Sequence, residues 1–203
     1  MRRPTAIRVR RRRPNLRMEP ACLPSRAIMS SQARGSSAIV GPTRIETGDR
    51  QLDPSVPRLW AAYLAKSGQP LSTPAPEAWH FCDNERDADT CAGLVLTGRK
   101  RATAPSLWFF ELHGLVPPSL GDLDIVTNWK GVAQCIIQTT AVQILRFREV
   151  TAEHARLEGE DDGSLESWRA AHWAYYHREL QGTKYEPHED MPLVCQYFEV
   201  VFP

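Results

Sequence analysis

A lysine and a threonine lie three residues apart, at Lys100 and Thr103, within the segment 98–103 (GRKRAT). The segment follows an amphipathic run over residues 89–96, and Gly98 is suited to end that helix in a left-handed conformation. A lysine and a hydroxyl placed after such a turn can point into one cleft, where they can bind an anion or activate a nucleophile. On its own, the segment is equally typical of a glycine-capped helix followed by solvated charges.

The apolar periodicity and the turn residues predict helices and strands that alternate along the chain. The expected helices cover 59–68, 84–96 (capped by Asp83 or Asn84), 106–113, 151–157 and 165–180, and the expected strands cover 123–127, 132–145 and 193–202. Short turns or irregular insertions join these strands. The pattern therefore favours an α+β fold with a mostly antiparallel sheet that can close on itself, over a doubly wound parallel sheet.

The basic residues are concentrated near the start of the chain. Residues 1–50 contain twelve arginines and three acids, a net charge of +9, and the remaining 153 residues contain 13 basic and 21 acidic residues, a net charge of −8. Because the first part is also rich in Pro, Ser and Gly, we predict a disordered Arg-rich tail over 1–54. It could hold nucleic-acid phosphates, act as an organelle transit peptide, or be leader translated from a start codon assigned too far upstream, which is the interpretation we favour.

The five cysteines show no spacing typical of metal ligands. Cys91, Cys135 and Cys195 lie inside apolar runs, so we expect reduced, buried thiols in a cytoplasmic protein. No apolar run approaches the roughly 18 residues that a membrane span needs. A membrane is therefore not an expected partner.

Several motifs occur in a fixed order over residues 55–203. They are Trp79-x-Phe81, Asp83-Asn84, the GxKxxT piece, Gly121-Asp122, Thr139-Thr140, the stretch 150–159, Trp168-x-x-x-His172 and Phe198-x-Val200. Their order and spacing resemble the ASCH-domain family, in particular its small stand-alone bacterial members. The resemblance implies a PUA-like, mostly antiparallel β-barrel, with helices around a cleft that binds RNA or a nucleoside-like ligand.

The resemblance also implies candidate site residues. Some small family members are amidohydrolases that remove the acyl group from N4-acylated cytidine, and their lysine, threonine and glutamate match Lys100, Thr103 and Glu158. Lys100 would serve as the base if partial burial lowers its pKa, Thr103 would attack or orient water, and Glu158 would move the proton or hold the cytosine amine. Other members resemble ribonucleases or RNA-binding modules, so both remain alternatives for the same cleft. No cofactor and no metal is expected.

Further residues are candidates for ligand contacts, either as cations or as stacking surfaces. They are Arg99, Arg101, Trp108, His172 and Trp173. Many family members carry an arginine two residues after the threonine, where this chain has Pro105, so a cation that could hold a phosphate is absent there. The −8 charge of the folded part also opposes tight binding of a polyanion.

His154 and Glu158 are four residues apart, which would place them on one face of a continuous helix. Such a pair can bind a metal, but it forms a local hydrogen bond more often. We therefore expect a hydrogen bond between the two side chains.

Overall fold

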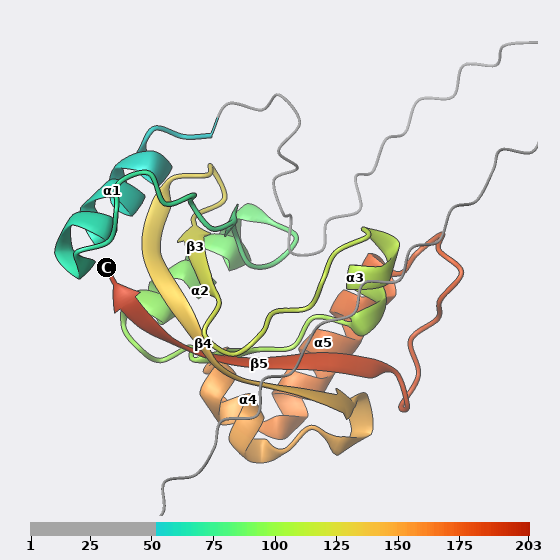
Figure 1. Cartoon of the computed structure of the whole chain (residues 1–203). Helices are drawn as coiled ribbons and strands as arrows, with labels where there is room; N and C mark the ends of the chain where they lie inside the picture. Colours follow the sequence, from blue (N-terminus) through green and yellow to red (C-terminus); the bar gives the residue numbers. More distant parts are fainter. Residues whose placement is uncertain (1–51) are drawn as a thin grey trace, which may run out of the picture. The chain divides into compact units, whose positions relative to one another are not determined.

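Two long antiparallel strands, β4 (Ala133–Arg146) and β5 (Pro192–Phe202), form the centre of the fold (Figure 1). The computed structural model describes residues 52–203, and the predictions for the tail before residue 52 lie outside that range. Three shorter strands complete the sheet: β1 (Ala78–Trp79), β2 (Ala102–Thr103) and β3 (Leu123–Thr127). The strand order is β1-β3-β4-β5-β2, and only the β1–β3 pair is parallel.

The described sheet is therefore open and mixed, although it is mostly antiparallel as predicted. The two edge strands, β1 and β2, contain two residues each and lie at opposite ends of the strand order. Because they do not pair with each other, the closed barrel that the resemblance implied is not seen among residues 52–203. Register shifts at Ile136/Ile137 and Thr139/Ala141 interrupt the β4–β5 pairing, and irregularities of this kind bend a strand.

Five helices surround the sheet in the described part of the chain. They are α1 (Ser55–Ser67), α2 (Glu85–Leu96), α3 (Leu107–Leu112), α4 (Ala152–Glu158) and α5 (Leu165–Glu179), with a 3-10 turn over Phe147–Glu149 before α4. Side chains cap four of them at their amino ends by accepting a backbone N–H bond: Asn84, Ser106, Thr151 and Ser164. The predicted helices are thus confirmed to within a few residues, because polar caps and turn glycines mark their ends in the sequence.

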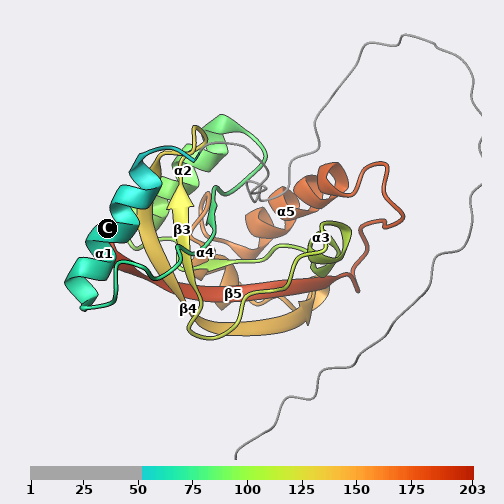
Figure 2. The ribbon, with the colours of Figure 1, turned by 45° about the horizontal axis from the view of Figure 1, so that its top comes forward.

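The two faces of β4 are covered by different helices. Ile136 packs in the cluster with Trp60 of α1, whereas Cys135 and Ile137 pack in the cluster with Val95 of α2. Successive strand residues point to opposite faces, so this part of the sheet is buried on both sides. The carboxyl end of β5 lies beside α1 in both ribbon views (Figures 1 and 2).

A third cluster joins α4 and α5 to the other half of β5. Its buried members include Phe147, Trp168, Tyr176, Leu193 and Cys195. The three cysteines expected to be buried thiols are buried, and none of them forms a disulfide within residues 52–203. No helix within residues 52–203 combines the length and the apolar character that crossing a membrane requires.

Candidate functional site

The turn after α2 sets the position of Lys100. Gly98 has a φ of 71°, in the left-handed region, as its place in the sequence predicted. The N–H groups of Arg99 and Lys100 both donate to the carbonyl of Leu94, which closes the end of the helix. The next N–H, that of Arg101, donates to the carbonyl of Leu157 in α4 at 2.7 Å. The segment that leaves α2 is thereby fixed against α4.

A second glycine lets the two backbones meet. Gly159 ends α4 with a φ of 65°, and a Cβ atom added to it would lie 2.6 Å from the carbonyl oxygen of Arg99. No real side chain tolerates that distance, so the turn at Arg99 can approach α4 only because residue 159 is glycine. This close approach brings Lys100 to Glu158, which lies 58 residues further along the chain.

The ammonium group of Lys100 is buried between two carboxylates. The Lys100 side chain is 1% exposed, and its Nζ lies 2.8 Å from Oε2 of Glu158 and 2.6 Å from Oε1 of Glu160. The same Nζ lies over the ring of Phe81, 5.1 Å from its centroid. A buried charge is very costly unless it is paired, and here the carboxylates and the aromatic face compensate for the lost water.

This environment corrects the predicted role of Lys100. Burial alone lowers the pKa of the lysine, but the charges of Glu158 and Glu160 outweigh it and hold the pKa well above its ordinary value. The condition that we set for Lys100 to act as a base, a pKa lowered by burial, is therefore not met. The lysine contributes a fixed positive charge instead.

Glu158 is held by donors on both of its oxygens. Oε2 accepts from Lys100, and Oε1 accepts from Nε1 of Trp168 at 2.8 Å and from Nε2 of His154 at 3.0 Å. Nε2 of His172 lies 3.5 Å from the same oxygen. Burial raises the pKa of Glu158, but the charges of Lys100 and His172 outweigh it and hold that pKa well below its ordinary value. Glu158 is thus an ionised carboxylate inside the protein.

The expected His154–Glu158 hydrogen bond is present. Since an ionised carboxylate only accepts, Nε2 of His154 must carry the proton. Nδ1 of His154 lies 3.1 Å from the hydroxyl of Tyr197, which fixes the other side of the ring. The histidine therefore orients Glu158.

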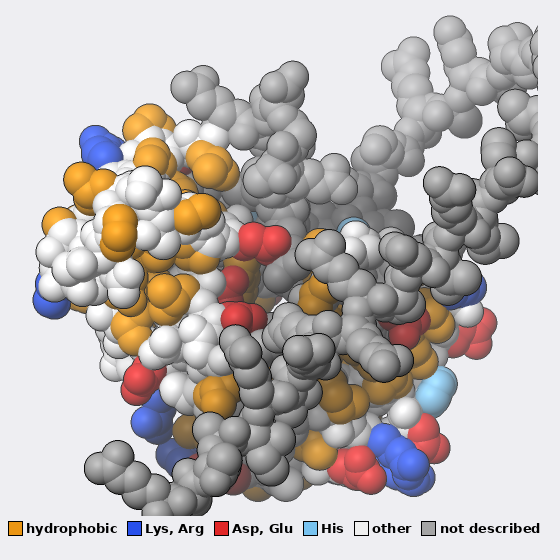
Figure 3. All heavy atoms as spheres, viewed as in Figure 1, with side chains coloured by type: hydrophobic (Ala, Val, Ile, Leu, Met, Phe, Trp, Pro, Cys, Tyr) orange, Lys and Arg blue, Asp and Glu red, His pale blue; other side chains and the backbone are white. Residues whose placement is uncertain are grey.

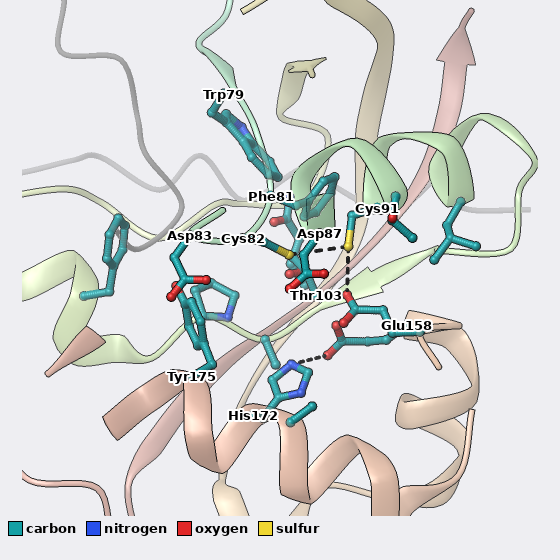
Figure 4. A pocket seen from close by; sticks show the side chains of 18 of the residues that line it. Trp79, Phe81, Cys82, Asp83, Asp87, Cys91, Thr103, Glu158, His172 and Tyr175 are labelled. Carbon is teal, nitrogen blue, oxygen red and sulfur yellow. Dashed lines mark hydrogen bonds and ion pairs between the residues drawn. The ribbon is translucent and has the colours of Figure 1, made fainter. Parts of the chain in front are cut away.

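A cavity of about 240 Å³ opens beside this charged group (Figure 4). That volume is slightly below the roughly 300–1,000 Å³ usual for ligand pockets. Aromatic side chains line part of it: Trp79, Phe81, Phe109, Phe110 and Tyr175. Carboxylates line another part: Asp83, Asp87, Asp124, Glu158, Glu160 and Asp161. Acidic side chains also gather near the middle of the face seen in Figure 3.

Positive charge is scarce in the lining. Arg178 is the only lysine or arginine among the described residues that line the cavity, and its Nε donates to Oδ2 of Asp83 at 2.7 Å. The lining thus combines aromatic walls with carboxylates that exceed the cations. Such a cavity favours a flat, uncharged or cationic ligand over an anion.

Two of the predicted site residues besides Glu158 line the cavity. Thr103, in the edge strand β2, is half-buried, and its hydroxyl has no hydrogen-bond partner among residues 52–203. His172 reaches the cavity from α5, as labelled in Figure 4. Burial lowers the pKa of His172, but the nearby charge of Glu158 outweighs it and raises the pKa above the ordinary value.

The other predicted ligand contacts lie elsewhere. The ring of Trp108 stacks on Tyr185 with a centroid distance of 4.7 Å, and Trp173 packs against Phe147 at 5.1 Å. Neither tryptophan lines the cavity. Their aromatic partners hold both rings away from it.

The two arginines beside Lys100 do not line the cavity either. Arg99 donates through Nη2 to the backbone carbonyl of Asp161, and Arg101 is exposed. Only the lysine between them turns inward. The arginines consequently belong to the outer surface of the turn.

Glu160 is the site residue that the sequence reasoning missed. It lies in an acidic stretch with no pattern of its own. A signal was nonetheless present, because Glu158 and Glu160 flank the glycine that ends α4. In the structure both carboxylates turn toward Lys100 from either side of this glycine.

Comparison with known proteins identifies the family. The model of the ASCH domain matches residues 77–202. The chain belongs to the ASCH-domain family. The crystal structure of an ASCH domain from Lactobacillus crispatus JV V101 is 31% identical, with a TM-score of 0.69, and the match covers 79% of this chain and 100% of that one. Protein EF3133 from Enterococcus faecalis V583 is also 31% identical, with a TM-score of 0.67 and coverage of 73% and 88%. No curated protein matches this ASCH-domain chain significantly.

The charge pair makes a prediction about stability. Lys100→Met should lower the free energy of unfolding by about 3–5 kcal/mol, because it leaves Glu158 buried without its cation. The double variant Lys100→Met/Glu158→Gln removes both charges and should recover more than half of that loss. Urea denaturation measures both values. A single variant as stable as the wild type would show that the pair does not organise this region.

The close approach at Gly159 makes a second prediction, with a matched control in the same loop. Gly163 also has a positive φ, 73°, but an added Cβ would meet nothing within 4 Å. Gly163→Ala should cost only the roughly 1–2 kcal/mol of a left-handed conformation. Gly159→Ala should cost at least about 1 kcal/mol more in the same denaturation experiment, because its Cβ also collides with Arg99. Equal losses would contradict the tight contact.

The raised pKa of His172 makes a prediction about pH. A folded pKa above the ordinary value of 6.5 gives stability that is fully present below 6.5 and is lost as the pH rises through the folded pKa. Melting temperatures across this window should therefore decline for the wild type but not for His172→Gln. Parallel curves for the two proteins would show that Glu158 does not stabilise the protonated histidine.

Proposed function

We propose that this protein is an amidohydrolase that removes the acyl group from N4-acylated cytidine or a closely related compound. The observation that carries the proposal is the position of Thr103. Its hydroxyl lines the cavity, beside the carboxylates that Lys100 holds. A nucleophile and proton acceptors therefore line one cavity, and the fixed charge of Lys100 lies buried behind the carboxylates.

The chemistry assigns different tasks to these groups. Hydrolysis of an amide needs a nucleophile, a proton for the leaving amine and a charge that compensates the oxyanion. Thr103 attacks the acyl carbon or orients the attacking water. Lys100, which stays protonated and does not line the cavity, keeps the carboxylates in place through its positive charge. The proton must then be taken up by a carboxylate.

The walls of the cavity suit a cytosine ring. Its faces can stack on aromatic side chains such as Phe81 or Phe109, and its exocyclic nitrogen is a donor that carboxylates accept. A nucleoside carries no net charge, so the carboxylates of the lining do not repel it. These features support a nucleoside-sized substrate.

The same features argue against RNA as the principal ligand. A phosphate chain would meet the carboxylates of the lining, and the one lining arginine, Arg178, is already bound to Asp83. Arg99 and Arg101 remain outside the cavity as the cations that an RNA-binding module or a ribonuclease would use. Binding of RNA through them would weaken steeply with added salt.

The test is hydrolysis of N4-acetylcytidine by the whole chain, with cytidine measured by chromatography. The wild type should release cytidine, and Thr103→Val, which keeps the shape but removes the hydroxyl, should be slower by about 100-fold or more. Thr103→Ser keeps a hydroxyl and should retain more activity than Thr103→Val. Absence of release by folded wild-type protein, together with salt-sensitive binding of RNA, would replace the proposal with the RNA-binding alternative.

A further inference from the structure

The two carboxylates that bind Lys100 differ in their access to the cavity. The Glu158 side chain is 1% exposed, whereas the Glu160 side chain is 28% exposed. Both line the cavity, on either side of Gly159. A group that reacts with a ligand must reach it, and only Glu160 presents substantial surface.

The hydrogen bonds of Glu158 leave it little capacity for a ligand. Lys100 occupies Oε2, while Trp168 and His154 occupy Oε1, and His172 lies next to that oxygen. Three donors and the ring of His172, from three segments of the chain, thus surround one buried carboxylate. Transfer of a proton to Glu158 would disrupt this network and leave the buried positive charge of Lys100 with less negative charge to compensate it.

The oxygens of Glu160 are used differently. Oε1 accepts from Lys100 at 2.6 Å and from the Sγ of Cys91 at 3.3 Å, so the side chain is held on one oxygen. Oε2 has no hydrogen-bond partner among residues 52–203. A carboxylate fixed through one oxygen and open at the other can accept a proton or an N–H group from a ligand.

We propose that Glu160 is the catalytic carboxylate of this site and that Glu158 is a positioning residue for Lys100. The proposal rests on the proposed amidohydrolase function and refines it. It replaces the expected proton transfer by Glu158, because the structure gives that residue a full set of internal donors.

The proton balance of the step is simple. As the oxygen of water, or of Thr103, bonds to the acyl carbon, its proton passes to Glu160. The carbon–nitrogen bond then breaks, and Glu160 returns the proton to the leaving exocyclic nitrogen. With water as the nucleophile the products are the free amine and the carboxylic acid. With Thr103 as the nucleophile, a second water releases the acyl group from the threonine by the same transfers.

The test compares two isosteric substitutions in the whole chain, with N4-acetylcytidine as the substrate. Glu160→Gln should lower kcat by about 100-fold or more, while its melting temperature falls less than that of Glu158→Gln. Glu158→Gln should lower the melting temperature more and reduce kcat less than Glu160→Gln does. Glu166→Gln, an exposed carboxylate in α5 that does not line the cavity, is the control and should match the wild type.

A second measurement reports on the carboxylates without catalysis. Carbodiimide coupling of glycine ethyl ester, read by peptide mass spectrometry, should label Glu160 but not Glu158, and cytidine should slow the labelling of Glu160. Labelling of Glu158 ahead of Glu160 would overturn the assignment.

The outcomes separate this proposal from the proposed function. If the wild type hydrolyses N4-acetylcytidine and Glu160→Gln keeps its kcat, the role of Glu160 is overturned and the amidohydrolase stands. If the wild type does not hydrolyse it, the amidohydrolase and the proton transfer by Glu160 both fall. Protection of Glu160 by cytidine would then still support its contact with the ligand, and absence of protection would overturn that contact as well.

Discussion

Burial of the Lys100 ammonium between two carboxylates is the interaction on which the rest of the site depends. A charge at 1% exposure requires compensation, and each neighbouring feature contributes to it. The left-handed turn at Gly98 directs the lysine inward, and the absence of a side chain at Gly159 permits α4 to approach. His154 and Trp168 then fix the carboxylate of Glu158.

The rest of the cavity lining comes from segments that are spread along the chain. The loop before α2, α2 itself, α3, β3 and α5 supply aromatic or acidic side chains to it, and α5 also contacts Glu158 through Trp168 and His172. Thr103 joins the two parts, because β2 pairs with β5 on one side and its preceding residues bind α4 on the other. The buried charge network around Lys100 therefore forms one side of the cavity, and several separate segments form the rest of its lining. This arrangement lets the same charged residues act on any ligand that the rest of the lining accepts.

The sequence was sufficient for features that depend on neighbouring residues. Asn84 and Ser106 cap the helices that they were predicted to begin, and the β-branched run of β4 forms a strand. It was not sufficient where burial depends on distant partners. Lys100, in a run of three cations, resembled a solvated lysine, and only its contact with residues of α4 shows why its pKa rises rather than falls.

Dependence on distant partners also explains why the sequence did not predict the ligand contacts and the open sheet correctly. Trp108 and Trp173 were candidates by residue type, but stacking on Tyr185 and packing on Phe147 places them elsewhere. Strands of two residues, such as β1 and β2, leave no periodic signal, so the sequence could not show whether the sheet closes. The sequence separation of 58 residues between Lys100 and Glu158 also affects folding kinetics. Contacts between residues so far apart in sequence form slowly, and no early intermediate that contains only local helices can hold this site. Binding at the cavity therefore selects the completely folded chain and stabilises that state alone.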